Sequence, residues 1–162
     1  MERHPMTPAS YRKLAAELDR LKTVERPAIS AAIEEARAHG DLRENAEYHA
    51  AKDKQGHIEA RIRVLETKIA LSQVIDPASL SGAVVRFGAT VTLLDLDNDE
   101  EMTLSIVGED EADFKKGLLN YASPIARGLF GKEEGEEVSI EAPAGTRNFE
   151  ILKVVYKAIE TT

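Results

Sequence analysis

Three acidic residues, evenly spaced, are the side chains most able to do chemistry in this chain of 162 residues. Asp41, Glu44 and Glu47 follow one another at intervals of three, and residues so spaced share one side of a helix. One or two carboxylates are what a weakly held Mg²⁺ takes from a protein, with water or partner groups completing its shell. Asp41 and Glu44 also fit a capping box, which opens a helix. Spacing alone favours the cap, and the two interpretations are compatible.

Other polar side chains flank these carboxylates. Arg37 and Lys52 form a small basic pair, usually only solubilising, that could hold one or two phosphates. Tyr48 could stack on a base, although a partly buried place between helices is the plainer expectation. His49 and His57 are eight positions apart, or about 12 Å of helix, too far for one zinc ion to bind both. We therefore expect a solvated face there.

Several enzyme and membrane classes are excluded by what the sequence lacks. It contains no cysteine, no Ser–His–Asp arrangement, no Gly-rich phosphate loop and no paired-histidine helix motif. The chain is therefore not expected to be a complete enzyme, and another protein must supply the rest of any catalytic site. The first twenty residues contain no apolar signal-peptide core, and no run approaches the roughly 18 apolar residues of a membrane span. A cytoplasmic protein with no membrane partner is the expectation.

Charge is distributed unevenly along the chain. Residues 1–76 carry 13 Lys or Arg and 13 Asp or Glu, whereas residues 77–162 carry 8 and 16, which accounts for the net charge of −8. A strongly acidic segment is unsuited to gripping nucleic acid through phosphates. The balanced first segment is typical of solvated helices.

A change of pattern at Asp76–Gly82 predicts two domains, residues 1–76 and residues 77–162, and an α+β fold. Proline followed by serine and glycine ends helical structure there. Beyond it, β-branched runs predict an antiparallel sheet, and Ser123 with Pro124 predicts the start of one short helix. The expected strands are Ala89–Leu94, Thr103–Val107, Glu137–Ala142 and Phe149–Tyr156.

The first domain is predicted to be an antiparallel coiled-coil helical hairpin. Thr7 and Pro8 fit the start of its first helix, and Pro27 is expected to remove one backbone hydrogen bond and bend that arm. In such a hairpin the residue numbers of two facing positions add to a constant. The residue numbers of the apolar pairs here add to 83, which places an acidic tip at residues 40–44. These pairs are Leu14 with Ile69, Leu18 with Leu65, Leu21 with Ile62 and Ala32 with Ala51. In this register the seam near the tip consists of alanines, namely Ala28, Ala31, Ala32, Ala36, Ala46, Ala50 and Ala51.

The sequence at this tip, GDLRENAEYHAAK, resembles that of the bacterial Gre transcript-cleavage factors, of the GreA type. The likeness extends to Thr7-Pro8, to Glu25-Arg26-Pro27 and to the run Asn120–Lys132, and it covers essentially the whole chain. It implies a hairpin that enters the secondary channel of RNA polymerase and a C-terminal domain similar to the FKBP fold. It also implies that the factor stimulates the polymerase to hydrolyse backtracked RNA.

The resemblance assigns roles residue by residue. Asp41 and Glu44 would hold a second Mg²⁺ beside the polymerase's own ion, and this carboxylate pair would act in the RNA cleavage. The expected partners are RNA polymerase and the nascent RNA 3′ end, with DNA met only through the polymerase, and the chain is expected to be a monomer. Residues expected to contact RNA or the channel are Arg37, Leu42, Arg43, Asn45, Tyr48 and Lys52. Those expected to dock on the polymerase are Ser123, Pro124, Ile125 and Leu129.

Two other functions stay open from the sequence. One is a channel-binding regulator without cleavage activity, although the tip carboxylates count against it. The other is a prolyl isomerase or chaperone, suggested by the C-terminal fold alone; fold does not determine function, and this interpretation leaves the hairpin unexplained.

Overall fold

The structure is a computed structural model that describes residues 2–40 and 44–160. It forms two compact units, Arg12–Leu71 and Met1–Tyr11 with Ser72–Thr162. This division differs from the domains 1–76 and 77–162 expected from the sequence. The reason is a short parallel pairing that the sequence did not indicate: strand β1 (His4–Met6) pairs with β2 (Ser72–Val74), so both segments join the sheet unit.

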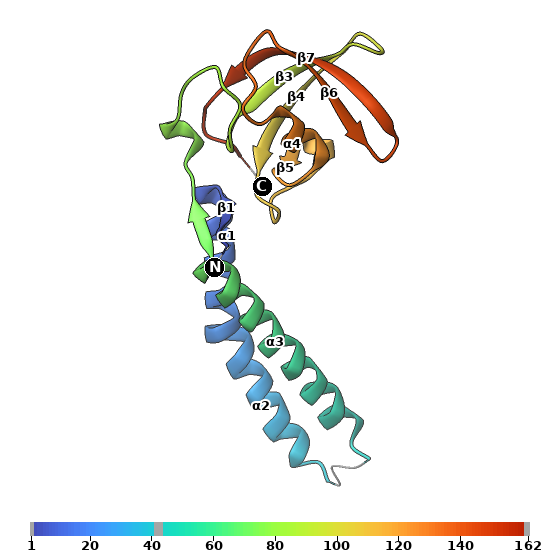
Figure 1. Ribbon diagram of the computed structural model, residues 1–162. Helices are drawn as coiled ribbons and strands as arrows, with labels where there is room; N and C mark the ends of the chain where they lie inside the picture. Colours follow the sequence, from blue (N-terminus) through green and yellow to red (C-terminus); the bar gives the residue numbers. More distant parts are fainter. Residues whose placement is uncertain (1, 41–43, 161–162) are drawn as a thin grey trace. The chain divides into compact units, whose positions relative to one another are not determined.

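The hairpin is helical throughout the described part of both arms (Figure 1). One arm consists of α1 (Pro8–Arg20), the π-helical turn η1 (Leu21–Glu25) and α2 (Arg26–Arg37), and the other is α3 (Ala46–Ala70). The expected start of the first helix is confirmed, because the backbone N–H of Ser10 donates to Thr7 Oγ1 at 3.3 Å.

The π-helical turn changes which residues face the second helix. The backbone N–H of Arg26 bonds to the carbonyl of Leu21, five residues back, and such a turn inserts one extra residue into a helix. The buried positions beyond it are therefore Ile29 and Ile33, 5% and 6% exposed. Ala28 and Ala32 are exposed. The prediction of an alanine seam near the tip was therefore wrong at Ala28 and Ala32, whereas Ala36 is buried as expected.

Ile29 and Ile33 belong to the apolar cluster that holds the hairpin together. Its buried members are Ile29, Ile33, Ile58 and Ile62, with Leu18, Leu21, Tyr48 and Ala51 packed against them. Each fully buried aliphatic side chain of this size stabilises by about 1.5–3 kcal/mol. Because the cluster includes Tyr48, large apolar side chains extend nearly to the tip.

Charged pairs also join the two arms across the surface. Arg26 makes a two-pronged contact with Glu59, at 2.9 and 2.8 Å, and Arg61 makes one with Glu17, at 3.2 and 2.8 Å. The hydrogen bond from Arg26 lowers the pKa of Glu59. Exposed pairs of this kind add little stability individually, but they are consistent with the antiparallel register.

The sheet unit contains a five-stranded sheet in the order β5-β4-β3-β7-β6. All its pairings are antiparallel except that of β4 with β5, which is parallel. The expectation of an antiparallel sheet was therefore wrong for this one pair of strands. Strand β5 has only three residues, too few for an alternating pattern to predict it. The elements are η2 (Pro77–Ser79), β3 (Thr90–Asp95), β4 (Glu100–Val107), η3 (Phe114–Lys116), β5 (Leu118–Asn120), α4 (Pro124–Leu129), β6 (Glu137–Ala142) and β7 (Gly145–Val155).

Helix α4 packs closely on the sheet. Ser123 caps it as expected, since its hydroxyl accepts from the backbone N–H of Ala126 at 3.3 Å. A Cβ atom on Gly128 would lie 2.7 Å from Cγ1 of Ile140, so glycine lets the helix backbone approach β6. Leu129 is fully buried in the main core of this unit. The α+β fold expected from the sequence is confirmed.

A buried carboxylate fixes the first residues of the chain to the sheet unit. Glu111 accepts hydrogen bonds from the backbone N–H groups of Thr7 and Gly108, at 3.2 and 3.1 Å, and from the hydroxyl of Thr7. Thr7 and Glu111 are 1% and 7% exposed. A Cβ on Gly108 would lie 2.7 Å from the carbonyl oxygen of Pro5. These contacts explain why residues 1–11 belong to the sheet unit. Among the described helices, none has both the length and the apolar character needed to cross a membrane.

Candidate functional site at the hairpin tip

The tip lies between the end of α2 and the start of α3. The N-cap of α3 is Asn45, whose side-chain oxygen accepts from the backbone N–H of Tyr48 at 3.1 Å. Asn is among the best N-cap residues. The capping box of Asp41 and Glu44 was therefore a wrong interpretation, because Glu44 precedes the cap and the helix begins only at Ala46.

Asn45 also joins the two arms. Its side-chain nitrogen donates to the backbone carbonyl of Ala36, in the last turn of α2, at 2.6 Å. Both polar atoms of this amide are thus engaged within the protein. The resemblance had suggested Asn45 as a contact to RNA or the channel, and the structure gives it an internal role that sequence reasoning missed. The available signal was the preference of Asn for N-caps.

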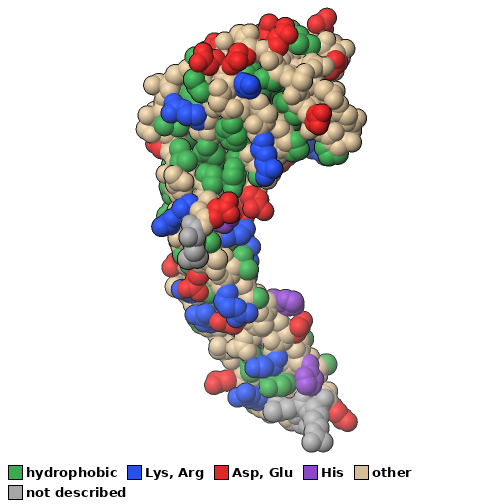
Figure 2. All heavy atoms as spheres, viewed as in Figure 1, with side chains coloured by type: hydrophobic (Ala, Val, Ile, Leu, Met, Phe, Trp, Pro, Cys, Tyr) green, Lys and Arg blue, Asp and Glu red, His purple; other side chains and the backbone are tan. Residues whose placement is uncertain are grey.

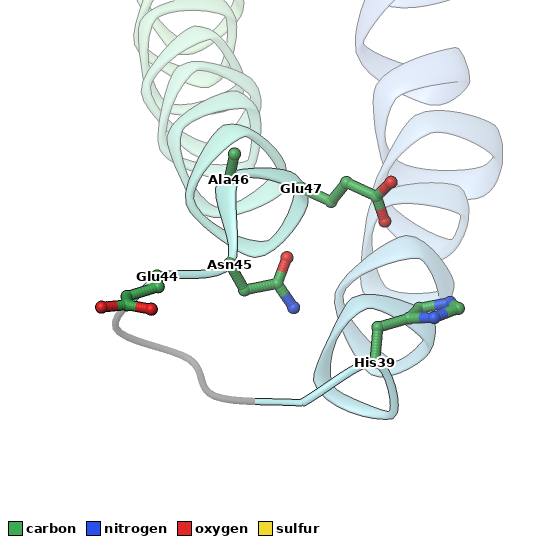
Figure 3. A pocket seen from close by; sticks show the side chains of 5 residues that line it. All are labelled: His39, Glu44, Asn45, Ala46 and Glu47. Atoms are coloured by element: carbon green, nitrogen blue, oxygen red, sulfur yellow. The ribbon is translucent and has the colours of Figure 1, made fainter.

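The described carboxylates of the tip do not converge. A shallow hollow here is lined by His39, Glu44, Asn45, Ala46 and Glu47. In Figure 3 the carboxylate of Glu44 points away from the hairpin, whereas Glu47 reaches toward the opposite helix, on the other side of Asn45. The expectation that the three carboxylates share one helical side therefore fails for Glu44 and Glu47. Asp41, Leu42 and Arg43 lie outside the described residues.

Glu44 is exposed and available to a ligand. Among the described residues, none makes a hydrogen bond or ion pair with its carboxylate. No group of three or more potential metal-binding side chains occurs within residues 2–40 and 44–160. An exposed carboxylate is a chemically suitable ligand for Mg²⁺, which commonly takes one or two carboxylates from a protein. The described donor set fits part of a magnesium site.

The basic and aromatic residues expected at the tip are partly brought together. The guanidinium of Arg37 lies over the Tyr48 ring, 5.9 Å from its centre, a distance suited to a cation–π contact. Tyr48 is half-buried in the hairpin cluster, as the plainer interpretation had it. Lys52 is exposed, and its ammonium donates to Gln55 at 3.1 Å.

The histidine face of α3 has the character expected of a solvated surface. His57 lies 3.4 Å from the carboxylate of Asp53, and both side chains are about 80% exposed. The two units differ in charge: residues 12–71 carry 12 Lys or Arg and 11 Asp or Glu, whereas the remainder carries 9 and 18. On the face in Figure 2, charges of both signs alternate on the hairpin, and acidic groups predominate along the rim of the sheet unit.

The expected docking residues divide into accessible and inaccessible positions. Pro124 is exposed and Ile125 half-buried, so both can meet a partner. Ser123 uses its hydroxyl to cap α4. Leu129 has no exposed surface, so its assignment to the docking surface was wrong. The helical spacing that places it near Ile125 turns its side chain into the core.

Comparison with known proteins establishes the family. Residues 4–74 match the family model described as the N-terminal domain of a transcription elongation factor, and residues 80–156 match the C-terminal domain of the GreA/GreB transcription elongation factors. The chain is 60% identical over 157 residues to transcription elongation factor GreA of Hyphomonas neptunium, with 97% of this chain and 100% of the relative covered. It is 60% identical over 156 residues to GreA of a Jannaschia species, covering 96% and 99%.

A solved structure, GreA factor homolog 1 (Gfh1) of Thermus thermophilus, is 26% identical, with a TM-score of 0.43 and coverage of 94% and 99%. The matched domains and the relatives at 60% identity show that the chain belongs to the GreA/GreB family of transcription elongation factors. The resemblance seen in the sequence is confirmed, and the chain has the function of a transcription elongation factor.

Proposed function

We propose that the protein stimulates the hydrolytic cleavage of backtracked RNA by RNA polymerase. In this proposal its hairpin enters the secondary channel, and Asp41 and Glu44 help to hold a second Mg²⁺ at the polymerase active site. The observation that carries it is the tip sequence GDLRENAEYHAAK, whose described residues lie at the ends of the two hairpin arms, with the Glu44 carboxylate exposed and unpaired among the described residues.

The hairpin has dimensions suited to this role. Helix α3 has 25 residues and is therefore about 37 Å long. Two packed helices with side chains are about 20 Å across, so the tip can reach deep into a narrow channel. The large apolar cluster and the cross-arm ion pairs support the hairpin along its length.

The tip carboxylates supply too few ligands to hold a metal ion alone. This is what a magnesium site shared with the polymerase would require. Glu44 is exposed and can bind an ion without breaking a hydrogen bond or ion pair to any described residue. Glu47 is not in the set, because its carboxylate points toward the other arm (Figure 3). When bound, a second Mg²⁺ would orient an attacking water and stabilise transition-state charge.

Other residues would serve binding rather than chemistry. Arg37 and Lys52 offer positive charge toward RNA phosphates, and Tyr48 keeps Arg37 in place through its ring. Pro124 and Ile125 offer a small apolar surface to the polymerase. The acidic sheet unit is unsuited to free nucleic acid, so nascent RNA and DNA would be met only within the polymerase complex.

The test is RNA cleavage in a stalled, backtracked polymerase complex, with and without the protein. Asp41→Asn and Glu44→Gln should each lower the stimulated rate by roughly two to three orders of magnitude, which corresponds to about 3–4 kcal/mol of transition-state stabilisation. Glu47→Gln is the matched control and should stay within about twofold of the wild type.

Competition with labelled wild-type protein shows whether the variants still bind. Both tip variants should compete normally, because the hairpin and the sheet unit are unchanged. A Glu44→Gln protein that cleaves at the wild-type rate would refute the assignment. A wild-type protein that binds polymerase without stimulating cleavage would favour the non-cleaving regulator instead.

A further inference from the structure

We infer that Asn45 is a positioning residue: it clamps the end of α2 to the start of α3 and so fixes the backbone from which Glu44 projects. This inference rests on the proposed function, since it assigns Asn45 to the presentation of a metal-binding carboxylate. It replaces the direct contact to RNA or the channel that the resemblance suggested for this residue.

The hydrogen bonds of the Asn45 amide carry the inference. The oxygen accepts from the backbone N–H of Tyr48 at 3.1 Å, within its own helix. The nitrogen donates to the carbonyl of Ala36 at 2.6 Å, across the hairpin. An N-cap needs only the first bond. The second bond has no role in capping α3. Aspartate has no donor for it, and serine or threonine would have to serve both partners with one oxygen on a shorter side chain.

The two partners of Asn45 are themselves held by packing. Ala36 is 4% exposed, and Tyr48 packs on the isoleucine cluster of the hairpin. Arg37, next to Ala36, lies over the Tyr48 ring. Because both ends of the clamp are anchored, a shift of Asn45 would disturb buried contacts on each arm.

The consequence concerns the residue directly before the clamp. Glu44 is covalently joined to Asn45, so a fixed Asn45 backbone limits the directions available to the Glu44 side chain. In Figure 3 the Asn45 amide points inward between the helices while Glu44 points outward. The amide nitrogen and oxygen of Asn45 are each engaged by a partner within the hairpin. Its effect on cleavage is therefore exerted through the position of Glu44.

Substitutions at position 45 separate the clamp from the cap. Asn45→Ser keeps a good N-cap but cannot reach Ala36, and Asn45→Asp keeps the shape and the cap but loses the donor. Asn45→Ala loses both. Relative to wild type, the serine and aspartate variants should lower cleavage at saturating factor by about 3- to 10-fold, the effect expected of one lost hydrogen bond. Their half-saturating concentration should not change.

A structural readout is independent of activity. In wild-type protein, the side-chain NH₂ protons of Asn45 should show slowed exchange with solvent by NMR. In Asn45→Ser the helix content by circular dichroism should be unchanged, because the cap remains. Fast exchange of the wild-type NH₂ protons would show that no clamp forms and would overturn the inference.

The activity measurements have distinct contrary outcomes. If Asn45→Ser cleaves like wild type while Asn45→Ala does not, Asn45 is only a cap. If Asn45→Ser raises the half-saturating concentration and leaves the maximal rate unchanged, Asn45 is a binding contact after all. Either result overturns the inference and leaves the proposed function intact. The proposed function fails instead if Asp41→Asn and Glu44→Gln cleave normally, and the clamp then loses its role in positioning a catalytic carboxylate.

Discussion

The register shift caused by the π-helical turn makes a quantitative prediction at two adjacent residues. Ile33 is 6% exposed and lies in the hairpin cluster, whereas Ala32 is exposed. Ile33→Ala removes three carbon atoms at about 0.8 kcal/mol each, or about 2.4 kcal/mol, and a residual cavity would add to this. Ala32→Gln should cost only about 0.4 kcal/mol, the difference in helix propensity.

If the first arm were an uninterrupted α-helix, Ala32→Gln would lower the stability more than Ile33→Ala. In that register Ala32 would face Ala51 within the seam, and glutamine there would overpack the interface by about 1–3 kcal/mol. Ile33 would lie outside the seam, and its truncation would cost little. The measurement is urea unfolding followed by circular dichroism at 222 nm, with amide exchange of α2 to localise the effect. A larger loss of stability for Ala32→Gln than for Ile33→Ala would refute the register shift that we assign to the π-helical turn.

Three further predictions concern the sheet unit. Glu111→Ala should lower the free energy of unfolding by about 2–4 kcal/mol in urea titrations, because three buried donors lose their acceptor; a loss under 1 kcal/mol would contradict this. Gly128→Ala should cost about 1–3 kcal/mol through its contact with Cγ1 of Ile140, and Ile140→Ala, which removes this atom, should cost less in the Gly128→Ala chain than in the wild type; additive losses would argue against the contact. The hydrogen bond from Arg147 lowers the pKa of Asp95. The stability that this pair contributes is therefore full above the unfolded pKa of about 3.9 and is lost as pH falls through the lower folded pKa. Arg147→Met should therefore reduce the fall of the urea midpoint between pH 6 and pH 3, and an unchanged fall would contradict the assignment.

Local signals in the sequence were sufficient where one residue determined one feature. Thr7 before Pro8 marked the start of α1, and Ser123 before Pro124 marked that of α4, because capping depends on residues a few positions apart. The antiparallel hairpin followed from apolar spacing over many turns. The family followed chiefly from the residues of the tip, because a run of thirteen specified positions is far more specific than a single cap, and the likeness extends to the run Asn120–Lys132.

The features that the sequence did not show depend on distant or competing interactions. The π-helical turn has no reliable sequence signature beyond the proline after it, and it moved the seam from Ala32 to Ile33. Asn45 and Asp41 are both suitable N-cap residues, and the sequence did not show which of them caps α3. The bond from Asn45 to Ala36 joins residues nine positions apart on different arms. Glu111 meets Thr7 across 104 positions, a contact that no local pattern could reveal. Leu129 was assigned to the surface because the sequence of α4 does not indicate which of its sides packs on the sheet.

The central claim, that the tip carboxylates help to hold Mg²⁺, is tested most directly by the magnesium dependence of stimulated RNA cleavage. The rate is measured for wild-type protein and for Glu44→Gln at saturating factor, over a series of Mg²⁺ concentrations, with Glu47→Gln as the control. If Glu44 is a ligand, its loss weakens ion binding. The half-saturating Mg²⁺ concentration should then rise at least tenfold for Glu44→Gln, and the rate should partly recover at high Mg²⁺. An unchanged half-saturating concentration with a reduced plateau would contradict the claim.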